Sequence, residues 1–384
     1  MNVRGFDLTY CSNIHAGEAW PDVQRALAGA LPSIRRSLNA SGPFAIGLRL
    51  SARAAEELQQ PDTFASLLAF LRDGDYYVPT INGFPYGAFH GERVKERVYL
   101  PDWRERARVD YSNRLATILA ALAAARGRDR GSVSTVPGAF KAHLRSDDDA
   151  ASIALGILDH ARHLVSLHDS TGVSIALAIE PEPACFIETG AEAIDFFDRY
   201  LFNSHLARQR GVTVDQVRTH IGVCFDACHM AVEFEDHEAV LEALDLAGIR
   251  VPKFQISSAL RVTDAAGREA LRRFAEDTYL HQVVSRSNES LTRFVDLPDA
   301  LEQRHGSEWR VHFHVPVFLR SLGDLGTTQP DLERVLELVK TRTDSPCLEV
   351  ETYTWDVLPP EHRTAAMSDA IASELAWTRD RLES

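Results

Sequence analysis

The sequence is poor in cysteine, with five in 384 residues. An odd number at wide spacing argues against a secreted fold held together by disulfides, and a chain this long buries enough surface to be stable without them. No apolar run reaches the length of about eighteen residues typical of a transmembrane helix. The first ten residues, MNVRGFDLTY, contain no apolar signal segment. We therefore expect a cytoplasmic protein with reduced thiols and no segment inserted in a membrane.

The sequence also has fewer basic than acidic residues. The chain has 41 Lys and Arg residues against 55 Asp and Glu residues, which gives a net charge of −14. Proteins that bind nucleic acid need a concentrated basic face, so we expect no nucleic-acid partner. The G-x-G-x-x-G motif of dinucleotide-binding sheets is also missing after the first predicted strand, which argues against an open nucleotide-binding sheet.

What the sequence does contain is a regular alternation of elements. Short β-like runs are followed by longer amphipathic stretches with helical periodicity. This alternation predicts parallel strands joined by helical crossovers, which is an α/β fold. The predicted strands are residues 6–10, 45–50, 77–81, 132–136, 175–179, 221–225, 251–256, 310–315 and 347–352.

Roughly eight strand–helix units predict a (β/α)8 TIM barrel, a fold that usually takes about 250 residues before insertions. We predict a single domain that spans residues 1–384. One of the nine predicted strands is surplus, and it falls in the interval of about 257–345, which has further β-like pieces. We interpret this interval as an insertion before the last strand, at the catalytic face of the barrel.

Polar residues follow one predicted strand after another, at the end where a TIM barrel keeps its active site. Glu182 follows the fifth strand, and Asp226 follows the sixth, with His229 three residues further on. Because side chains alternate along a strand, neighbours two residues apart share a face. The other polar residues at strand ends are Gln255, the pair His312 and His314 on the surplus strand, and the pair Glu349 and Glu351 on the last strand.

Carboxylates and imidazoles gathered at one mouth are costly to bury unless something positive lies among them. Each residue alone also has a structural explanation. Glu180 and Glu349, one step deeper along their strands, suit structural hydrogen bonds as well as chemistry. Their joint placement favours a single divalent cation at the strand ends. The donor types suit Mn, Mg, Co, Fe or Zn without distinguishing among them.

Two motifs resemble the xylose-isomerase-like TIM-barrel superfamily, which includes ketose 3-epimerases and the endonuclease IV branch. Glu182-Pro-Ala-Cys-Phe-Ile-Glu188-Thr is similar to the superfamily's E-P-x-x-x-x-E-T, and Asp226-Ala-Cys-His229-Met is similar to its D-T-F-H-M. The resemblance implies that Glu182 and Asp226 bind the metal. It also implies that Glu188 and His229 contact the substrate.

Two further segments match this pattern less fully. Gln255 stands where the superfamily has a ligand histidine, in a segment that keeps its arginine, Arg261, and Glu351 matches the ligand Glu of the final strand. Either Gln255 binds the metal through its oxygen, or another nitrogen completes the sphere, with His314 as our candidate. The expected ligands are therefore Glu182, Asp226, Gln255 or His314, and Glu351.

A narrower resemblance is carried by the segments LTYCSNIHAGEAW, INGFPYGAFHGERVKERVYLPDW and LEVETYTWDVLP. They are similar to the EboE-type metabolite traffic proteins of bacterial Ebo gene clusters. This resemblance implies a role in making or moving a small metabolite. It also implies functional partners that are encoded in the same cluster.

The resemblance leads us to expect isomerisation or epimerisation of a small, sugar-like polyhydroxy carbonyl compound. Glu182 and Glu351 would remove and return a proton at carbon, while the cation polarises the carbonyl. The residues expected to hold the substrate or wall the mouth are His229, Glu188, Arg261, His90 and Trp103. Assembly of the chain into a homo-oligomer stays open.

Two alternatives are also open. The first is a metal-dependent phosphoester hydrolase, as in the endonuclease IV branch, for which histidines such as His312 could supply ligands. The second is a non-catalytic protein that binds a metabolite, because Gln255 at a ligand position is what loss of catalysis would leave behind.

Overall fold

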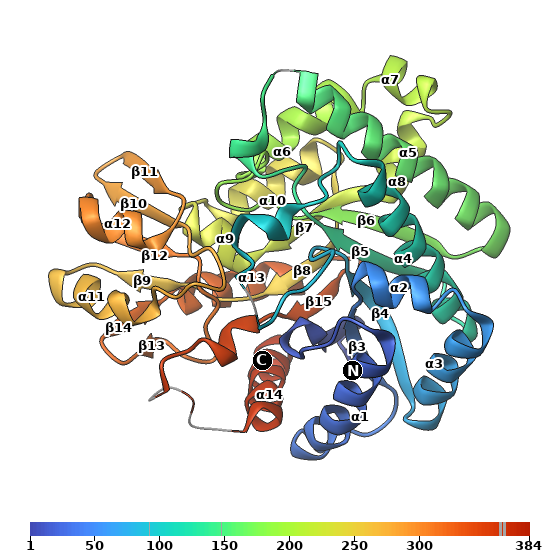
Figure 1. Cartoon of the computed structure of the whole chain (residues 1–384), viewed down its shortest axis with the longest axis horizontal. Helices are drawn as coiled ribbons and strands as arrows, with labels where there is room; N and C mark the ends of the chain where they lie inside the picture. Colours follow the sequence, from blue (N-terminus) through green and yellow to red (C-terminus); the bar gives the residue numbers. More distant parts are fainter. Residues whose placement is uncertain (92, 147, 361–362, 364–365) are drawn as a thin grey trace.

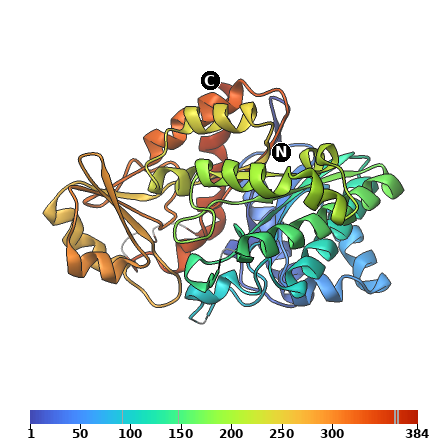
Figure 2. The same ribbon diagram turned by 90° about the horizontal axis from the view of Figure 1, so that it is seen from above.

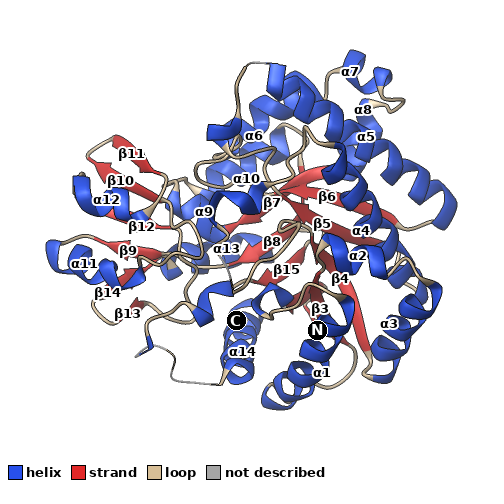
Figure 3. Cartoon of the chain, viewed as in Figure 1, coloured by secondary structure: helices blue, strands red, loops and turns tan. Residues whose placement is uncertain are grey.

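The structure, a computed structural model, describes residues 1–91, 93–146, 148–360, 363 and 366–384. Eight parallel strands form a barrel with helices around it (Figures 1 and 3), so the predicted (β/α)8 fold is confirmed. The barrel strands are β2 (Phe6–Tyr10), β3 (Phe44–Arg49), β4 (Tyr76–Asn82), β5 (Arg130–Thr135), β6 (Ser174–Ile179), β7 (Ile221–Asp226), β8 (Arg250–Ile256) and β15 (Cys347–Val350).

The strands follow the barrel in chain order. From β3 to β8 each strand pairs with the next, and β15 pairs with both β8 and β2. The remaining seam, between β2 and β3, is joined by a parallel bridge between Cys11 and Gly47. A short strand, β1 (Asn2–Val3), adds an antiparallel hairpin to β2.

Helices cover the outside of the barrel (Figure 2). In α1, apolar residues recur every three or four positions, and Val23, Leu27 and Ile34 are buried, as expected for a helix with one face on a core. Among the described residues, no helix combines the length and hydropathy needed to cross a membrane. The barrel helices are α1 (Trp20–Ser37), α2 (Ala52–Glu57), α3 (Pro61–Asp73), α4 (Arg106–Ala125), α5 (Asp148–Thr171), α6 (Gly190–Phe196), α7 (Ser204–Gln209), α8 (Val214–His220), α9 (Ala227–Val232), α10 (His237–Leu246), α13 (Gln329–Lys340) and α14 (Met367–Glu383).

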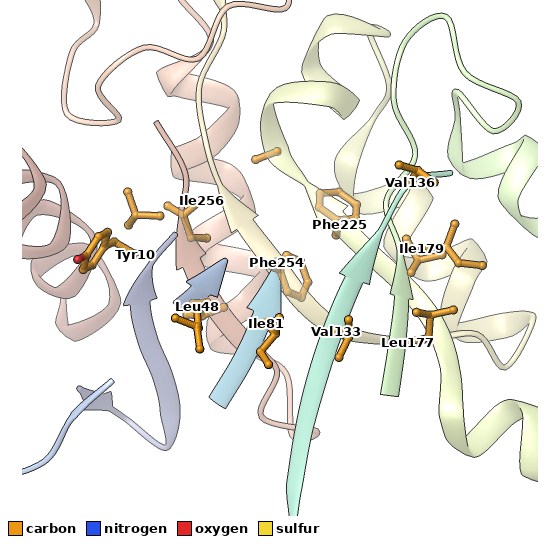
Figure 4. Packing of buried hydrophobic residues seen from close by; sticks show 14 of the residues in the cluster. Tyr10, Leu48, Ile81, Val133, Val136, Leu177, Ile179, Phe225, Phe254 and Ile256 are labelled. Carbon is orange, nitrogen blue, oxygen red and sulfur yellow. The ribbon is translucent and has the colours of Figure 1, made fainter. Parts of the chain in front are cut away.

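The two faces of the barrel strands differ in polarity. Along β8, Phe254 and Ile256 belong to the apolar core (Figure 4). Lys253, one position earlier, reaches across the interior, and its Nζ lies 3.0 Å from Oγ of Ser134 on β5. Nζ of Lys253 is also 2.5 Å from Oε2 of Glu349, and both side chains are fully buried. TIM barrels usually fill this interior with bulky branched residues, whereas this barrel holds a buried ion pair there.

The predicted insertion before the last strand forms a second, antiparallel sheet beside the barrel (Figures 1 and 2). Its strand order is β11-β10-β12-β9-β14-β13. The single-domain assignment of residues 1–384 stays a prediction. The inserted elements are β9 (Leu260–Val262), α11 (Ala265–Ala270), β10 (Val283–Ser287), β11 (Ser290–Phe294), α12 (Leu297–Gln303), β12 (Glu308–Val311), β13 (Ser321–Leu322) and β14 (Leu325–Thr327).

One predicted strand in this interval is too long. Residues 310–315 were expected to form a strand with His312 and His314 on one face, but β12 ends at Val311. The N–H of Phe313 donates to the carbonyl of Val311 at 2.7 Å, and this tight turn takes the chain out of the sheet. The N–H of Val315 donates to the carbonyl of Ser258, just beyond β8, at 2.9 Å and not to a strand of the inserted sheet. The histidines therefore cross from the inserted sheet to the barrel mouth.

The seam of the barrel generates the first prediction. A Cβ at Gly47 would lie 1.8 Å from Oε1 of Glu349 and 2.6 Å from the carbonyl oxygen of Tyr10. We expect Gly47→Ala to lower the free energy of unfolding by about 1–3 kcal/mol or more, as overpacking does, measured by urea denaturation. The control is Gly29→Ala, an exposed site in α1 where a Cβ meets nothing, which should instead add about 0.5–1 kcal/mol. Equal stability of the two variants would contradict the steric role of Gly47.

A buried carboxyl group in α14 generates the second prediction. Oε1 of Glu374 accepts hydrogen bonds from the Thr352 hydroxyl at 2.6 Å and the Val317 N–H at 3.1 Å. Burial raises the pKa of Glu374 from 4.5 to about 7. Between these values the folded chain holds a proton that the unfolded chain has lost. The stability contributed by this group is therefore complete below pH 4.5 and falls as the pH rises through 7, by about 1.4 kcal/mol for each pH unit between the two pKa values.

Glu374→Gln removes this titration. We expect the loss of unfolding free energy between pH 5 and pH 8 to be smaller in Glu374→Gln than in the wild type by on the order of 2 kcal/mol, measured by denaturation at both pH values. The exposed Glu383→Gln serves as control and should keep the wild-type slope. A slope in Glu374→Gln equal to that of the wild type would show that this group does not titrate as described.

Candidate metal centre

Three carboxylates meet at the carboxyl end of the barrel, and we call them the carboxylate group: Glu180, Asp226 and Glu351. Glu180 directly follows β6, Asp226 is the last residue of β7, and Glu351 directly follows β15. Each offers an oxygen within 4.8 Å of the oxygens of the other two. Gln255 on β8 is the register partner of Asp226, so its side chain lies on the same face of the sheet.

The electrostatics of the carboxylate group are unfavourable as the residues stand. All three members are buried. Burial, followed by the charge of Asp226, raises the pKa of Glu351 to about 8. Burial, then Glu351 and Asp226, raises the pKa of Glu180 well above its usual range. Lys253 acts in the opposite direction on both, but it already forms an ion pair with Glu349. Negative charge therefore exceeds positive charge here.

Several polar atoms in this region have no hydrogen-bond partner among the described residues: Glu180 Oε2, Asp226 Oδ2, and both amide atoms of Gln255. Unsatisfied buried polar atoms of this kind are rare in proteins. The other oxygen of Asp226, Oδ1, is held by the His229 N–H at 2.9 Å and the Ser257 hydroxyl at 2.7 Å. One oxygen is thus oriented while the other is free, which fits residues that bind a divalent cation through oxygen.

Two side-chain amide groups orient the carboxylate of Glu351, the third member of the carboxylate group. Oε1 of Glu351 accepts hydrogen bonds from Nδ2 of Asn13 at 2.8 Å and from Nδ2 of Asn82 at 3.0 Å. Asn82 is the last residue of β4, and Asn13 lies three residues after β2, but sequence reasoning gave them no role in the site. They set the direction of Glu351 without adding charge.

Glu182 lies in a different group from the one expected. The ligand role predicted for it beside Asp226 and Glu351 stays a prediction: the carboxylate grouped with those two is that of Glu180, and Glu182 is grouped with His229 and His312. Oε1 of Glu182 instead accepts a hydrogen bond from the Tyr99 hydroxyl at 2.6 Å and lies 3.7 Å from Nδ1 of His312. Burial raises the pKa of Glu182.

A cavity lies at this end of the barrel, beside these residues. Its polar floor carries Glu180 and Glu351 of the carboxylate group together with Glu182, His229 and His312. Its walls are largely apolar and aromatic. The ring centroids of Phe89, Tyr279 and Tyr353 lie within 5.1–5.4 Å of one another. The cavity is lined by Asn13, Asn82, Phe84, Pro85, Phe89, Val94, Lys95, Val98, Tyr99, Glu180, Glu182, His229, Tyr279, Leu280, His312, Glu351 and Tyr353.

Of the residues predicted to contact substrate, His229 lines this cavity, but two predicted wall residues do not. Trp103 is fully buried, and its indole N–H donates to the Thr135 hydroxyl at 3.1 Å, so it supports β5 from behind. Nε2 of His90 lies 2.5 Å from the carbonyl oxygen of Asn13. His90 therefore supports a residue of the cavity floor without facing the cavity itself.

The other two predicted substrate residues also lie outside the cavity. Glu188 forms an ion pair with Lys141 and accepts the N–H of Ala184 at 2.8 Å. Arg261 lies on β9, where its guanidinium is 2.8 Å from Oε1 of Glu308. Both side chains are thus occupied by local ion pairs, which motif spacing alone does not reveal.

Sequence reasoning also missed residues that long loops bring to the site. Tyr99 comes from the loop after β4, and Gln282 comes from the insertion. Nε2 of Gln282 donates to the Tyr99 hydroxyl at 2.9 Å and lies 3.4 Å from Oε1 of Glu182. Neither residue stands at the end of a barrel strand, so the rule that located the carboxylates could not find them.

No family model matches the chain, and no curated protein matches it. Among solved structures, the chain is similar to a xylose isomerase-like TIM barrel protein from Mycobacterium smegmatis in complex with magnesium, with 12% identity, a TM-score of 0.52, and coverage of 98% of this chain and 96% of that chain. It is also similar to D-allulose 3-epimerase from Methylomonas sp., with 12% identity, a TM-score of 0.51, and coverage of 100% of both chains. At this identity the likeness shows the fold alone, a TIM barrel.

The third prediction tests the carboxylate group. Asp226→Asn keeps an oxygen for the His229 N–H but removes the negative charge. We expect it to weaken binding of Mn²⁺ by on the order of 100-fold or more, since even losing a residue that orients a ligand costs about 10–100-fold, measured by isothermal titration calorimetry. Asp236→Asn, the same change at the exposed N-cap of α10, should bind Mn²⁺ as the wild type does. Unchanged affinity in Asp226→Asn would count against a cation at this site.

Proposed function

We propose that this protein is a divalent-metal-dependent isomerase or epimerase of a small, sugar-like polyhydroxy carbonyl compound. One observation carries the proposal. Glu180, Glu182 and Glu351 are buried carboxylates that line one cavity, and oxygens of Glu180 and Glu182 lack hydrogen-bond partners among the described residues. A metal-assisted proton transfer at carbon needs this combination of ligands and bases next to bound substrate.

The carboxylate group, with Gln255 beside it, would hold the cation through oxygen donors, which suits Mg²⁺ or Mn²⁺. When bound, the cation would polarise the substrate carbonyl and stabilise the negative charge that develops on its oxygen. This assignment puts Glu180 in the place that the sequence gave to Glu182, and it leaves Glu182 free for proton transfer.

Glu182 and Glu351 are our proposed pair for moving the proton. They approach the cavity from the ends of β6 and β15, with β7 and β8 between them around the barrel. Isomerisation needs one group that takes a proton while another returns it, so one carboxyl must hold a proton near neutral pH. Burial raises the pKa of Glu182, which favours proton transfer at this carboxyl group.

The rest of the cavity suits a molecule with one apolar face and several hydroxyl groups. Phe84 and Tyr353 offer aromatic surface, and His229 offers a polar group on the floor. The resemblance of chain segments to EboE-type proteins supports a place in the biosynthesis or traffic of a small metabolite, in the cytoplasm, beside proteins encoded in the same cluster. Likeness of fold to a D-allulose 3-epimerase supports a sugar-like substrate.

The fourth prediction uses a panel of ketoses and aldoses with Mn²⁺ in deuterated water, read by NMR. We expect wild-type protein to incorporate deuterium at the carbon next to the carbonyl. Glu182→Gln should lower kcat by about 10²–10⁴-fold, as loss of a general base does, while Mn²⁺ affinity is kept. Glu302→Gln, an exposed residue of the insertion, should react at the wild-type rate.

Two results would replace the proposal with an alternative. Phosphate release from phosphomonoesters or phosphodiesters, without sugar interconversion, would identify a hydrolase. Sugar binding that survives EDTA, without turnover, would identify a non-catalytic binding protein.

A further inference from the structure

Three buried histidines meet beside the carboxylate group. His229 lies in α9, whereas His312 and His314 lie in the inserted segment after β12. Nε2 of His312 lies 3.1 Å from Nε2 of His229 and 3.2 Å from Nε2 of His314. Nε2 of His312 therefore contacts Nε2 of both other histidines, and the position of the hydrogens decides whether these contacts are favourable.

The other ring nitrogens of the outer two histidines fix their tautomers. Nδ1 of His229 lies 2.8 Å from the carbonyl oxygen of Pro181, and Nδ1 of His314 lies 2.7 Å from the carbonyl oxygen of Glu351. A carbonyl oxygen only accepts hydrogen bonds. Both Nδ1 atoms must therefore donate, which leaves each Nε2 of a neutral ring with a lone pair.

The central histidine is fixed in the same way. Nδ1 of His312 lies 2.7 Å from Oε1 of Gln282. The amide nitrogen of Gln282 donates to the carbonyl oxygen of Pro183 at 3.0 Å, which sets the amide orientation and makes Oε1 the acceptor. In the neutral rings, the Nε2 lone pair of His312 then faces those of His229 and His314 without a hydrogen between them, and the Tyr353 hydroxyl lies 3.5 Å from the same nitrogen. Such an arrangement is repulsive unless a cation lies among them.

The distances suit a metal ion. Two donors that lie about 2.0–2.1 Å from one ion, at ordinary tetrahedral or octahedral angles, are about 3.0–3.4 Å apart. Nδ1–H bonded to an oxygen, with Nε2 free for the metal, is the usual arrangement of a ligand histidine. Oδ2 of Asp226 lies 3.6 Å from Nε2 of His229 and has no hydrogen-bond partner among the described residues. Asp226, His229 and His314 offer ligand atoms within 4.8 Å of one another, so Asp226 would supply a fourth donor and a negative charge.

We propose that the protein binds a second divalent cation, of the Zn²⁺, Co²⁺ or Fe²⁺ class, at a histidine site next to the carboxylate group. Imidazole donors favour these ions over Mg²⁺. Asp226 belongs to both sites, and a carboxylate between two ions is a common feature of paired metal centres. The ligands of the histidine site are His229, His312, His314 and Asp226.

The second ion would also face the cavity, because His229 and His312 line it. His229 then acts as a ligand, where the resemblance implied a contact to substrate. Two ligands of the second ion, His312 and His314, come from the insertion, so a barrel without this inserted segment would lack them. The insertion thereby adds nitrogen donors to a site whose barrel strands supply mainly oxygen.

The experiment measures metal stoichiometry on full-length protein that has been stripped with EDTA, reloaded with Zn²⁺ and freed of unbound ion. We expect wild-type protein to retain two Zn²⁺ per chain by mass spectrometry. The double variant His312→Ala/His314→Ala should retain one, and Glu351→Gln should keep the ion of the histidine site. The matched control is His305→Ala, an exposed histidine of the same insertion, which should retain two.

Loading with Co²⁺ identifies the donors and needs no variant to fold. Co²⁺ with few ligands, several of them nitrogen, absorbs visible light far more strongly than octahedral Co²⁺ with oxygen ligands. We expect wild-type protein and Glu351→Gln to show the strong absorption and the double histidine variant to lose it. At most one Zn²⁺ in the wild type, or two in the double variant, would overturn the proposal. Neither outcome depends on which reaction the protein catalyses.

Discussion

Buried negative charge at the carboxyl end of the barrel is the constraint on which the rest of the structure depends. Glu349 is balanced by Lys253 at 2.5 Å, and this pair fills the interior below the carboxylate group. The members of that group have no such partner, and burial together with their mutual repulsion raises the pKa values of Glu180 and Glu351. A bound cation offsets that repulsion and the cost of desolvation together. In the proposed function, the same ion would also supply the chemistry.

The insertion completes this end of the barrel. The turn after β12 carries His312 and His314 over the strand ends, and Tyr279 supplies part of the cavity wall. The inserted chain is fastened to the barrel by specific bonds, such as the Thr354 hydroxyl to the carbonyl of His314 and the Val317 N–H to Glu374 in α14. The cavity therefore exists only where the insertion and the barrel meet.

Much of the fold could be predicted because the signals were local. Alternating strand and helix periodicity located all eight barrel strands, and the strand-end rule pointed to Asp226 and Glu351. The rule could not choose between Glu180 and Glu182, since they follow β6 only two residues apart and both line the cavity. It also could not show that Trp103 and Arg261 already have structural partners. The roles of Tyr99 and Gln282 could not be predicted for another reason. Long loops place these residues, and no periodic pattern describes a loop.

Gly47 joins two features that are usually separate in a barrel. It closes the seam between β2 and β3, and the space that its missing side chain leaves is taken by the carboxylate of Glu349. That carboxylate is the one held by Lys253. Gly47 therefore affects both the closure of the barrel and the placement of the ion pair in its interior. A redesign that makes the barrel wider or narrower must therefore also reposition the ion pair of Lys253 and Glu349.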